Sequence, residues 1–132
     1  MLPFSINFRP DQPPYEQVVF AVKKAVFTGV LRSGDKFPSV RTLSQELHIN
    51  PNTAHKVVTQ LTAEGLLQVQ PGIGTVVQPA RPSHAADRKR WLEAHAERLA
   101  VEARHLGIDD AQLLAAISRH LARQSSAPPA SP

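Results

Sequence analysis

The sequence predicts a mainly α-helical (α+β) fold, an N-terminal winged helix-turn-helix followed by a short C-terminal two-helix dimerisation region. Three observations lead to this prediction. Two short helix patterns follow one another within residues 39–64, with only a tight turn between them. Two strand patterns separated by glycines come directly after them. Two further amphipathic helix patterns lie beyond a segment that contains two prolines.

The composition limits the class of protein. A chain of 132 residues with 42% apolar residues can hold one globular domain, or a smaller domain with an appended element. The chain has no cysteine, which excludes disulfides and thiolate metal sites and is typical of a cytoplasmic protein. We find no signal peptide and no apolar run near the roughly 20 residues of a membrane span. The sequence therefore predicts a soluble, cytoplasmic protein with no membrane partner.

The net charge of +4 is spread over both halves of the chain. Up to Gln78, seven Lys and Arg minus five Asp and Glu give +2, and beyond it eight minus six give +2 again. Such a modest, unclustered excess permits nucleic-acid binding but does not demonstrate it.

Residues 1–12 form a predicted N-terminal arm of the first domain (residues 1–78). Its apolar side chains alternate with polar ones, at Phe4, Ile6 and Phe8. Alternation of this kind is typical of a strand with one buried face. An ordered coil with the same side chains tucked inward explains the pattern equally well.

A first helix is predicted to begin at Pro13 and Pro14, because proline fits the first turn, where its missing N–H has no partner. One apolar stripe follows, formed by Val18, Val19, Val22, Ala25 and Val26. Gly29 is expected to end the helix, and residues 31–36 have the composition of a turn.

The next two helices carry the functional prediction. Ser39 is expected to cap the first of them, and Asn50 followed by Pro51 is expected to begin the second. The outer face of the second helix consists of Asn52, Thr53, His55, Lys56, Thr59 and Gln60. No acidic residue occurs from Asn50 to Ala63. Amides, hydroxyls, an imidazole and an ammonium can contact base edges and phosphates, and a face without carboxylates does not repel DNA.

Gly65 is expected to end this helix and to lead into a hairpin. Residues 66–70 and 75–78 are its predicted strands, and residues 71–74 its turn.

Beyond a predicted linker at residues 79–83, residues 84–123 are expected to form a helical hairpin for dimerisation. Ser83 or Asp87 is the expected cap of its first helix, and Asp109 with Gln112 that of its second. A heptad-like seam is formed by Leu92, Ala96, Leu99, Ala103 and Leu106. The apolar face of the second helix includes Leu114, Ile117 and Leu121. These faces are expected to pack against a second copy of the chain; packing against the chain's own first helix is the alternative. Residues 124–132 are expected to be a disordered tail.

Five motifs resemble the DNA-binding domain of the GntR family of bacterial transcription regulators. They are PYEQV at residues 14–18, GVLRSGDKFPSVRTLS at 29–44, NPNT at 50–53, EGLL at 64–67 and GIGT at 72–75. The resemblance covers residues 14 to about 77 nearly without gaps. The short two-helix C-terminal region resembles the YtrA subfamily, since the other subfamilies carry larger C-terminal domains.

The resemblance implies a homodimer that binds double-stranded DNA at an inverted-repeat operator, usually as a repressor. It also implies DNA contacts by Ser39, Arg41, Asn50, Asn52, Thr53, His55, Lys56 and the wing residues Gly72, Gly74 and Thr75. Thr59 joins them by its position on the outer face. Whether Arg41 contacts a base or a phosphate stays open. Subfamily members often control transporter operons, and we expect an unknown small-molecule effector as a further partner. The wing tip departs from the family pattern because it has no Arg or Lys.

We predict no catalytic residue, no metal site and no cofactor, and thus not an enzyme. The six histidines show neither an i, i+4 pair nor a His-Glu-x-x-His pattern. An adaptor that uses a winged helix to bind proteins is the remaining alternative.

Overall fold

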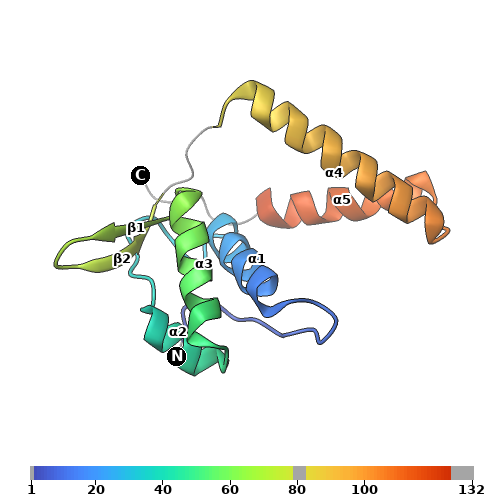
Figure 1. Ribbon diagram of the computed structural model, residues 1–132. Helices are drawn as coiled ribbons and strands as arrows, with labels where there is room; N and C mark the ends of the chain where they lie inside the picture. Colours follow the sequence, from blue (N-terminus) through green and yellow to red (C-terminus); the bar gives the residue numbers. More distant parts are fainter. Residues whose placement is uncertain (1, 79–82, 126–132) are drawn as a thin grey trace. The chain divides into compact units, whose positions relative to one another are not determined.

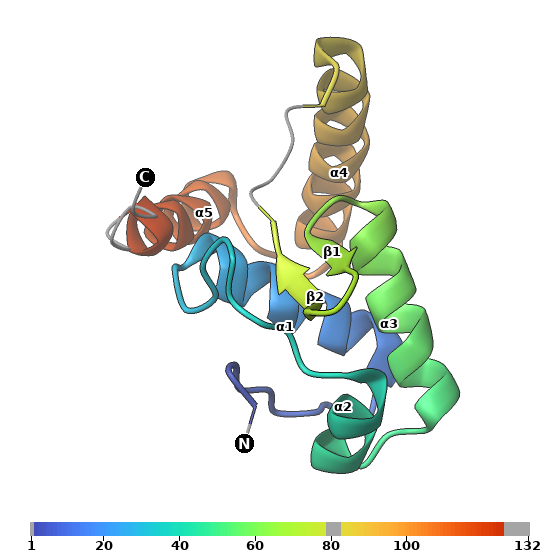
Figure 2. The ribbon, with the colours of Figure 1, turned by 90° about the vertical axis from the view of Figure 1, so that its left-hand side faces the viewer.

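The computed structural model describes residues 2–78 and 83–125. The chain divides between residues 80 and 81 into two compact units, which are described separately. The first unit contains α1 (Pro14–Phe27), α2 (Val40–Leu47), α3 (Pro51–Ala63), β1 (Leu67–Gln70) and β2 (Gly74–Val77). The second contains α4 (Ala85–His105) and α5 (Asp110–Ser125) (Figures 1 and 2). The predicted fold class, mainly α-helical with a small antiparallel wing, is confirmed.

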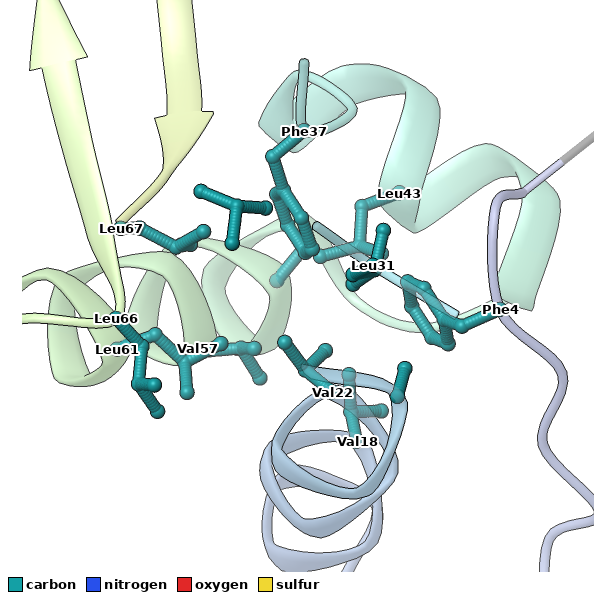
Figure 3. Close-up of a cluster of buried hydrophobic side chains, with 13 residues drawn as sticks. Phe4, Val18, Val22, Leu31, Phe37, Leu43, Val57, Leu61, Leu66 and Leu67 are labelled. Atoms are coloured by element: carbon teal, nitrogen blue, oxygen red, sulfur yellow. The ribbon is translucent and has the colours of Figure 1, made fainter. Parts of the chain in front are cut away.

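One hydrophobic core holds the first unit together. Its central side chains have no exposed surface and come from α1, α2 and α3, namely Val18, Val22, Leu43, Ala54, Val57 and Leu61. Leu66 and Leu67, which Figure 3 labels, close the core at the base of the hairpin. Val77 of β2 belongs to the same core. Burying each Val or Leu side chain contributes about 1.5–3 kcal/mol. The predicted stripe of α1 faces this core, with Val19 and Val26 at its partly buried edge.

The N-terminal arm is an ordered coil rather than a strand. Phe4 is buried against Phe37, with ring centroids 6.0 Å apart and an angle of 7° between the ring planes. Figure 3 shows Phe4 entering the core from the arm, beside Leu31. Ile6 is partly buried on the same core, whereas Phe8 is exposed. The side chains alternate as in a strand, but the arm is anchored by side-chain packing instead of by a strand partner.

The segment predicted as a turn, residues 31–36, also forms the outer edge of the wing. Its backbone lies along β2, where Gly34 N–H donates to Val77 O and Val77 N–H donates to Asp35 O, both at 2.8 Å. Lys36 bridges to Val76 in antiparallel fashion. β2 therefore has a neighbour on each side near its base, which fixes the hairpin to the body of the domain.

The second unit begins differently from the prediction. His84, not Ser83 or Asp87, occupies the N-cap position of α4, and its side chain makes no capping hydrogen bond. Asp87 lies inside the first turn, where its carboxylate pairs with Arg90. The cap of α5 is confirmed, since Gln112 N–H donates to Asp109 Oδ1 (2.8 Å) and Asp109 N–H donates to Gln112 Oε1 (3.2 Å).

Helix α5 continues to Ser125, so residues 124 and 125 are helical and do not belong to the predicted disordered tail. Residues 126–132 of that tail, like residues 79–82 of the predicted linker, lie outside the described residues. Within the described ranges, no helix is long and apolar enough to cross a membrane.

Candidate nucleic-acid interface

The start of α2 presents Arg41 to solvent. Ser39 is the N-cap, and its hydroxyl accepts from Thr42 N–H (3.1 Å) and donates to Thr42 Oγ1 (3.1 Å). The Ser39 hydroxyl is thus engaged in holding the first turn of the helix. Arg41 follows in that turn and is exposed. Among residues 2–78 and 83–125, no carboxylate lies within salt-bridge distance of its guanidinium, which stays available for an anion.

A tight connection sets α3 next to α2. His48 ends α2 in the left-handed conformation (φ 54°, ψ 44°), and Ile49 N–H donates back to Ser44 O (3.1 Å). Asn50 then caps α3, because its Oδ1 accepts from Asn52 N–H (2.8 Å), and Pro51 takes the first helical position. The predicted start of the second helix is confirmed. This cap uses only the Asn50 oxygen, so its NH₂ group can still donate to a ligand.

The outer face of α3 carries the predicted DNA-contacting side chains. Asn52, His55, Lys56 and Thr59 are exposed, and Thr53 is half-buried. The opposite face is buried in the core through Ala54, Val57 and Leu61. These polar side chains therefore share one side of a helix whose other side is fixed. They offer donors, acceptors and one positive charge, without a carboxylate from Pro51 to Ala63.

The acidic residue that follows α3 is neutralised locally. Glu64 Oε1 accepts from Lys23 Nζ on α1 at 2.8 Å, and Glu64 Oε2 accepts from Gln60 Nε2 at 3.2 Å. Both charged side chains are about one-third exposed. Solvent screening makes such a pair worth little for stability. The pair instead offsets the negative charge of Glu64, which lies at the C-terminal end of α3, away from the N-terminal turns that carry Asn52 and His55.

The wing follows α3 at once. Its strands pair in the register Leu67↔Val77 to Gln70↔Gly74. Gly72 and Gly74 are exposed at the tip and have positive φ (78° and 107°), a conformation that favours glycine. Thr75 is half-buried, and its carbonyl accepts from Phe37 N–H (2.8 Å). Of the predicted wing residues, the two glycines are thus the more accessible.

The structure adds one residue, Lys36, to the candidate interface that the sequence analysis did not include. Lys36, assigned to a turn, lies beside β2 and is exposed. It provides a positive charge at the base of a wing that has none of its own. The signal in the sequence was weak, because only the pairing of residues 34–37 with β2 brings this lysine to the wing.

In the second unit, the predicted dimerisation residues are exposed, with one exception. Leu92, Leu99, Leu106, Leu114, Ile117 and Leu121 expose between 38% and 72% of their surface, and Ala96 is also exposed. Ala103 is 4% exposed, and its carbonyl accepts from Ile108 N–H (2.9 Å) at the turn between the helices. Ala103 therefore packs inside the hairpin and is not available to a partner.

Within the described part of the chain, no group of three or more His, Cys, Asp or Glu residues is arranged to hold a metal ion. His95 stacks on Trp91, with ring centroids 4.1 Å apart, and its Nδ1 lies 2.8 Å from Trp91 O. This histidine is engaged with its own helix.

Comparison with known proteins agrees with the geometry of the first unit. The family described as "Bacterial regulatory proteins, gntR family" matches residues 14–77. The HTH-type transcriptional repressor YtrA of Bacillus subtilis (strain 168) is 30% identical over 105 residues, which cover 79% of this chain and 81% of that protein. This chain spans only 14% and 26% of the length of two larger curated relatives.

Solved structures share the fold. A protein of Listeria monocytogenes EGD-e described as a transcriptional antiterminator superposes with a TM-score of 0.76 at 24% identity, covering 89% of this chain and 88% of its own. YtrA from Sulfolobus acidocaldarius, described as a GntR-family transcription factor, gives a TM-score of 0.53 at 24% identity, covering 92% and 99%. Both likenesses extend beyond the winged helix into the C-terminal helices, because they cover more than residues 14–77.

Proposed function

Because this chain belongs to the GntR family of bacterial regulatory proteins, we propose that it is a homodimeric repressor of an operator with inverted-repeat half-sites. Family membership makes it a transcriptional regulator with a DNA-binding helix-turn-helix, as its motifs predict. The dimer, the operator symmetry and the direction of regulation are our inferences.

The observation that carries the proposal is the acid-free outer face of α3. A polar helix surface without a partner usually carries Glu and Lys at salt-bridge spacing. Here the exposed side chains are amides, a hydroxyl, an imidazole and the Lys56 ammonium, and Arg41 stands exposed on the neighbouring helix. We infer that α3 enters the major groove, where Asn52 and His55 contact base edges near the N-terminus of the helix. For Thr53, Lys56 and Thr59 we infer contacts with phosphates or with further base edges.

The proposed dimer rests on the exposed apolar residues of α4 and α5. Leu92, Leu99 and Leu106 recur at heptad-like spacing on α4 and remain exposed. Covering them with the same residues of a second copy removes apolar surface from water on both chains. A two-fold dimer would present two α3 helices to DNA about one turn, or roughly 34 Å, apart, which calls for inverted half-sites.

The proposal extends to physiology. We infer that the operator controls a transporter operon, as the resemblance to the YtrA subfamily implies. We further propose, as a separate hypothesis, that a small molecule relieves repression. Genome-wide footprinting of the tagged protein would recover the operators and the regulated genes together. Titration of candidate transport substrates against operator binding would then test for the effector.

Fluorescence anisotropy on a footprinted site tests the DNA-binding step. The full chain should bind that site on the order of a thousand-fold more tightly than a scrambled duplex. Affinity for both should fall steeply between 50 and 200 mM salt, because Lys and Arg displace counterions from phosphates. Equal affinity for the two duplexes would overturn the proposal.

A further inference from the structure

A cleft lies between the N-terminal arm and α1. Its volume is about 550 Å³, and residues of both segments line it. A smaller cleft of about 130 Å³ shares part of this lining, namely Ser5, Ala21 and Lys24. Small-molecule sites in proteins typically enclose about 300–1,000 Å³. The larger cleft, which we call the arm cleft, is therefore of ligand size, and none of the proposed DNA-contacting residues lines it.

The arm is attached to the domain on both sides of this cleft. Gln17 of α1 holds one side, because its Oε1 accepts from Arg9 N–H (2.7 Å) and its Nε2 donates to Arg9 O (2.9 Å) and Gln12 O (2.8 Å). On the other side Phe4 is buried in the hydrophobic core. Residues 5–8 lie between these attachments in the sequence, and three of them line the cleft. The arm cleft is thus bounded by a segment that is held in place.

The sequence of α1 explains why there is space under the arm. Gln17, Ala21 and Lys24 stand at positions i, i+4 and i+7, which lie on one side of a helix, and all three line the arm cleft. The methyl group of Ala21 is the shortest side chain of the three. It leaves a hollow between its longer neighbours, and the exposed ring of Phe20 adds an apolar wall.

The charges of the lining indicate which ligand fits. Arg9 and Lys24 are cationic, and Glu16 is the one carboxylate among the lining residues, so the lining has an excess of one positive charge. Within residues 2–78 and 83–125, neither cation lies within salt-bridge distance of a carboxylate. Ile6 and Phe20 provide apolar surface beside them. Cations next to apolar surface match a carboxylate on an apolar body, because charge-assisted hydrogen bonds orient a ligand that apolar contacts retain.

The arm also contacts the segment that joins the wing to α2. Phe4 stacks on Phe37, and Figure 3 shows both rings in the core. Phe37 N–H donates to Thr75 O of β2 (2.8 Å). Two residues further along the chain, Ser39 caps α2, whose first turn carries Arg41. A ligand that displaces the arm would therefore act on a residue placed between the wing and the proposed DNA contacts of α2.

We propose that the arm cleft binds a small organic carboxylate with an apolar body, and that its occupation weakens operator binding. The carboxylate is bound by Lys24 and Arg9, and the apolar body packs on Phe20 and Ala21. Binding at the cleft does not depend on DNA, whereas its effect on the operator rests on the proposed function.

Nuclear magnetic resonance titration of the full chain tests the binding step. The probe is hydrocinnamate, a phenyl ring joined to a carboxylate by two methylene groups, and its neutral counterpart is hydrocinnamyl alcohol. Hydrocinnamate should cause saturable amide shifts at Ser5, Ile6, Asn7 and Ala21, with a dissociation constant on the order of 1 mM for so small a ligand. The alcohol should bind about ten-fold more weakly, because it lacks the charge.

Two substitutions on α1 test the assignment of the ligand groups. Lys24→Ala should lower hydrocinnamate affinity about ten-fold and leave the affinity for the alcohol unchanged. Ala21→Leu should abolish binding of both probes, because the larger side chain fills the cleft. Lys24 is exposed, so its variant keeps the test decisive if Ala21→Leu proves unstable in urea. Phe27→Ala is the matched control, since Phe27 is exposed on the same helix but lines neither cleft, and it should bind as wild type.

Three results would overturn the site: equal affinity for acid and alcohol, amide shifts confined to residues away from the arm and α1, or wild-type hydrocinnamate affinity in Lys24→Ala. Each of them can be recorded without DNA.

Fluorescence anisotropy on a footprinted operator tests the effect on DNA binding. Saturating hydrocinnamate should lower operator affinity about five-fold or more, relative to acetate at the same ionic strength. Unchanged operator affinity would overturn the regulatory role. Failure of the proposed function is different, because the protein without any probe would then show no preference for the operator over scrambled DNA.

Discussion

Arg41 is the residue for which two modes of DNA contact, with a base or with a phosphate, lead to different predictions. It is exposed in the first turn of α2, next to a cap that fixes the turn. A guanidinium can grip guanine O6 and N7 bidentately or clamp a phosphate. The two contacts differ in what they contribute, because only the first discriminates between sequences.

Replacing Arg41 by alanine decides between them. If Arg41 reads a base, Arg41→Ala should cost about 1–3 kcal/mol of discrimination between operator and scrambled DNA. If it contacts a phosphate, affinity for both duplexes should fall equally and the salt slope should decrease by about one. Arg32→Ala is a control for the loss of one exposed charge. If Arg41→Ala kept the wild-type discrimination, affinity and salt slope, Arg41 would not contact the DNA.

At the scale of the elements, the N-terminus of α3 combines folding with recognition. Asn50 caps the helix with its oxygen, while its NH₂ group is left for a ligand. Capping and binding can therefore be separated by substitution. Aspartate caps a helix about as well as asparagine, but it brings a negative charge to the proposed DNA surface.

Asn50→Ala should lower the free energy of unfolding by about 1 kcal/mol, because the Asn52 N–H loses its acceptor. Asn50→Asp should unfold with nearly wild-type stability in urea and yet bind the operator more weakly. The urea midpoint and operator affinity of both proteins check this pair. A stable Asn50→Asp protein with undiminished affinity would show that Asn50 lies away from the DNA.

Local patterns predict most elements of the winged domain but not how distant segments meet. The starts of α1, α2 and α3 depend on residues within one turn, such as Ser39 and Pro51, and were predicted correctly. Lys36 was missed because its place beside β2 depends on hydrogen bonds between residues some 40 positions apart. Phe4 was ambiguous for the same reason, since its partner, Phe37, is remote in the sequence.

At the N-terminus of α4, local reasoning named two plausible caps, and neither forms. Asp87 pairs with Arg90 instead, one helical turn along. Which polar group binds the free amides of a helix depends on the position of its first turn, and helix boundaries are the least certain feature of a sequence pattern. The roles of Arg41, Asn52 and His55 stay predictions, because their exposure permits DNA contact without identifying the atom contacted.

At the scale of the whole molecule, the proposed function requires two DNA-binding domains, one from each copy of the chain. Most leucines of the α4 and α5 hairpin are exposed, whereas Ala103 is buried. Leu99 lies at the middle of the proposed seam. Val101, two residues further along the helix, points to the other side of α4.

Leu99→Asp should convert the dimer to monomers, because a carboxylate cannot be buried at the seam without a partner. The monomer should bind a two-half-site operator far more weakly than wild type. Val101→Asp, at a residue that is 62% exposed, should leave the dimer intact. Sedimentation velocity distinguishes the two, and an unchanged profile for Leu99→Asp would exclude Leu99 from the dimer contact.

Methylation interference on a footprinted operator tests most directly whether α3 reads the major groove. Dimethyl sulfate methylates guanine N7, an atom that lies in the major groove. Interference is predicted at two symmetric clusters of guanines separated by about one helical turn, roughly 34 Å. The interference at both clusters should weaken when Asn52 and His55 are both replaced by alanine. Tight, sequence-specific binding with no interference from N7 methylation would contradict the account, because α3 could not then lie in the major groove.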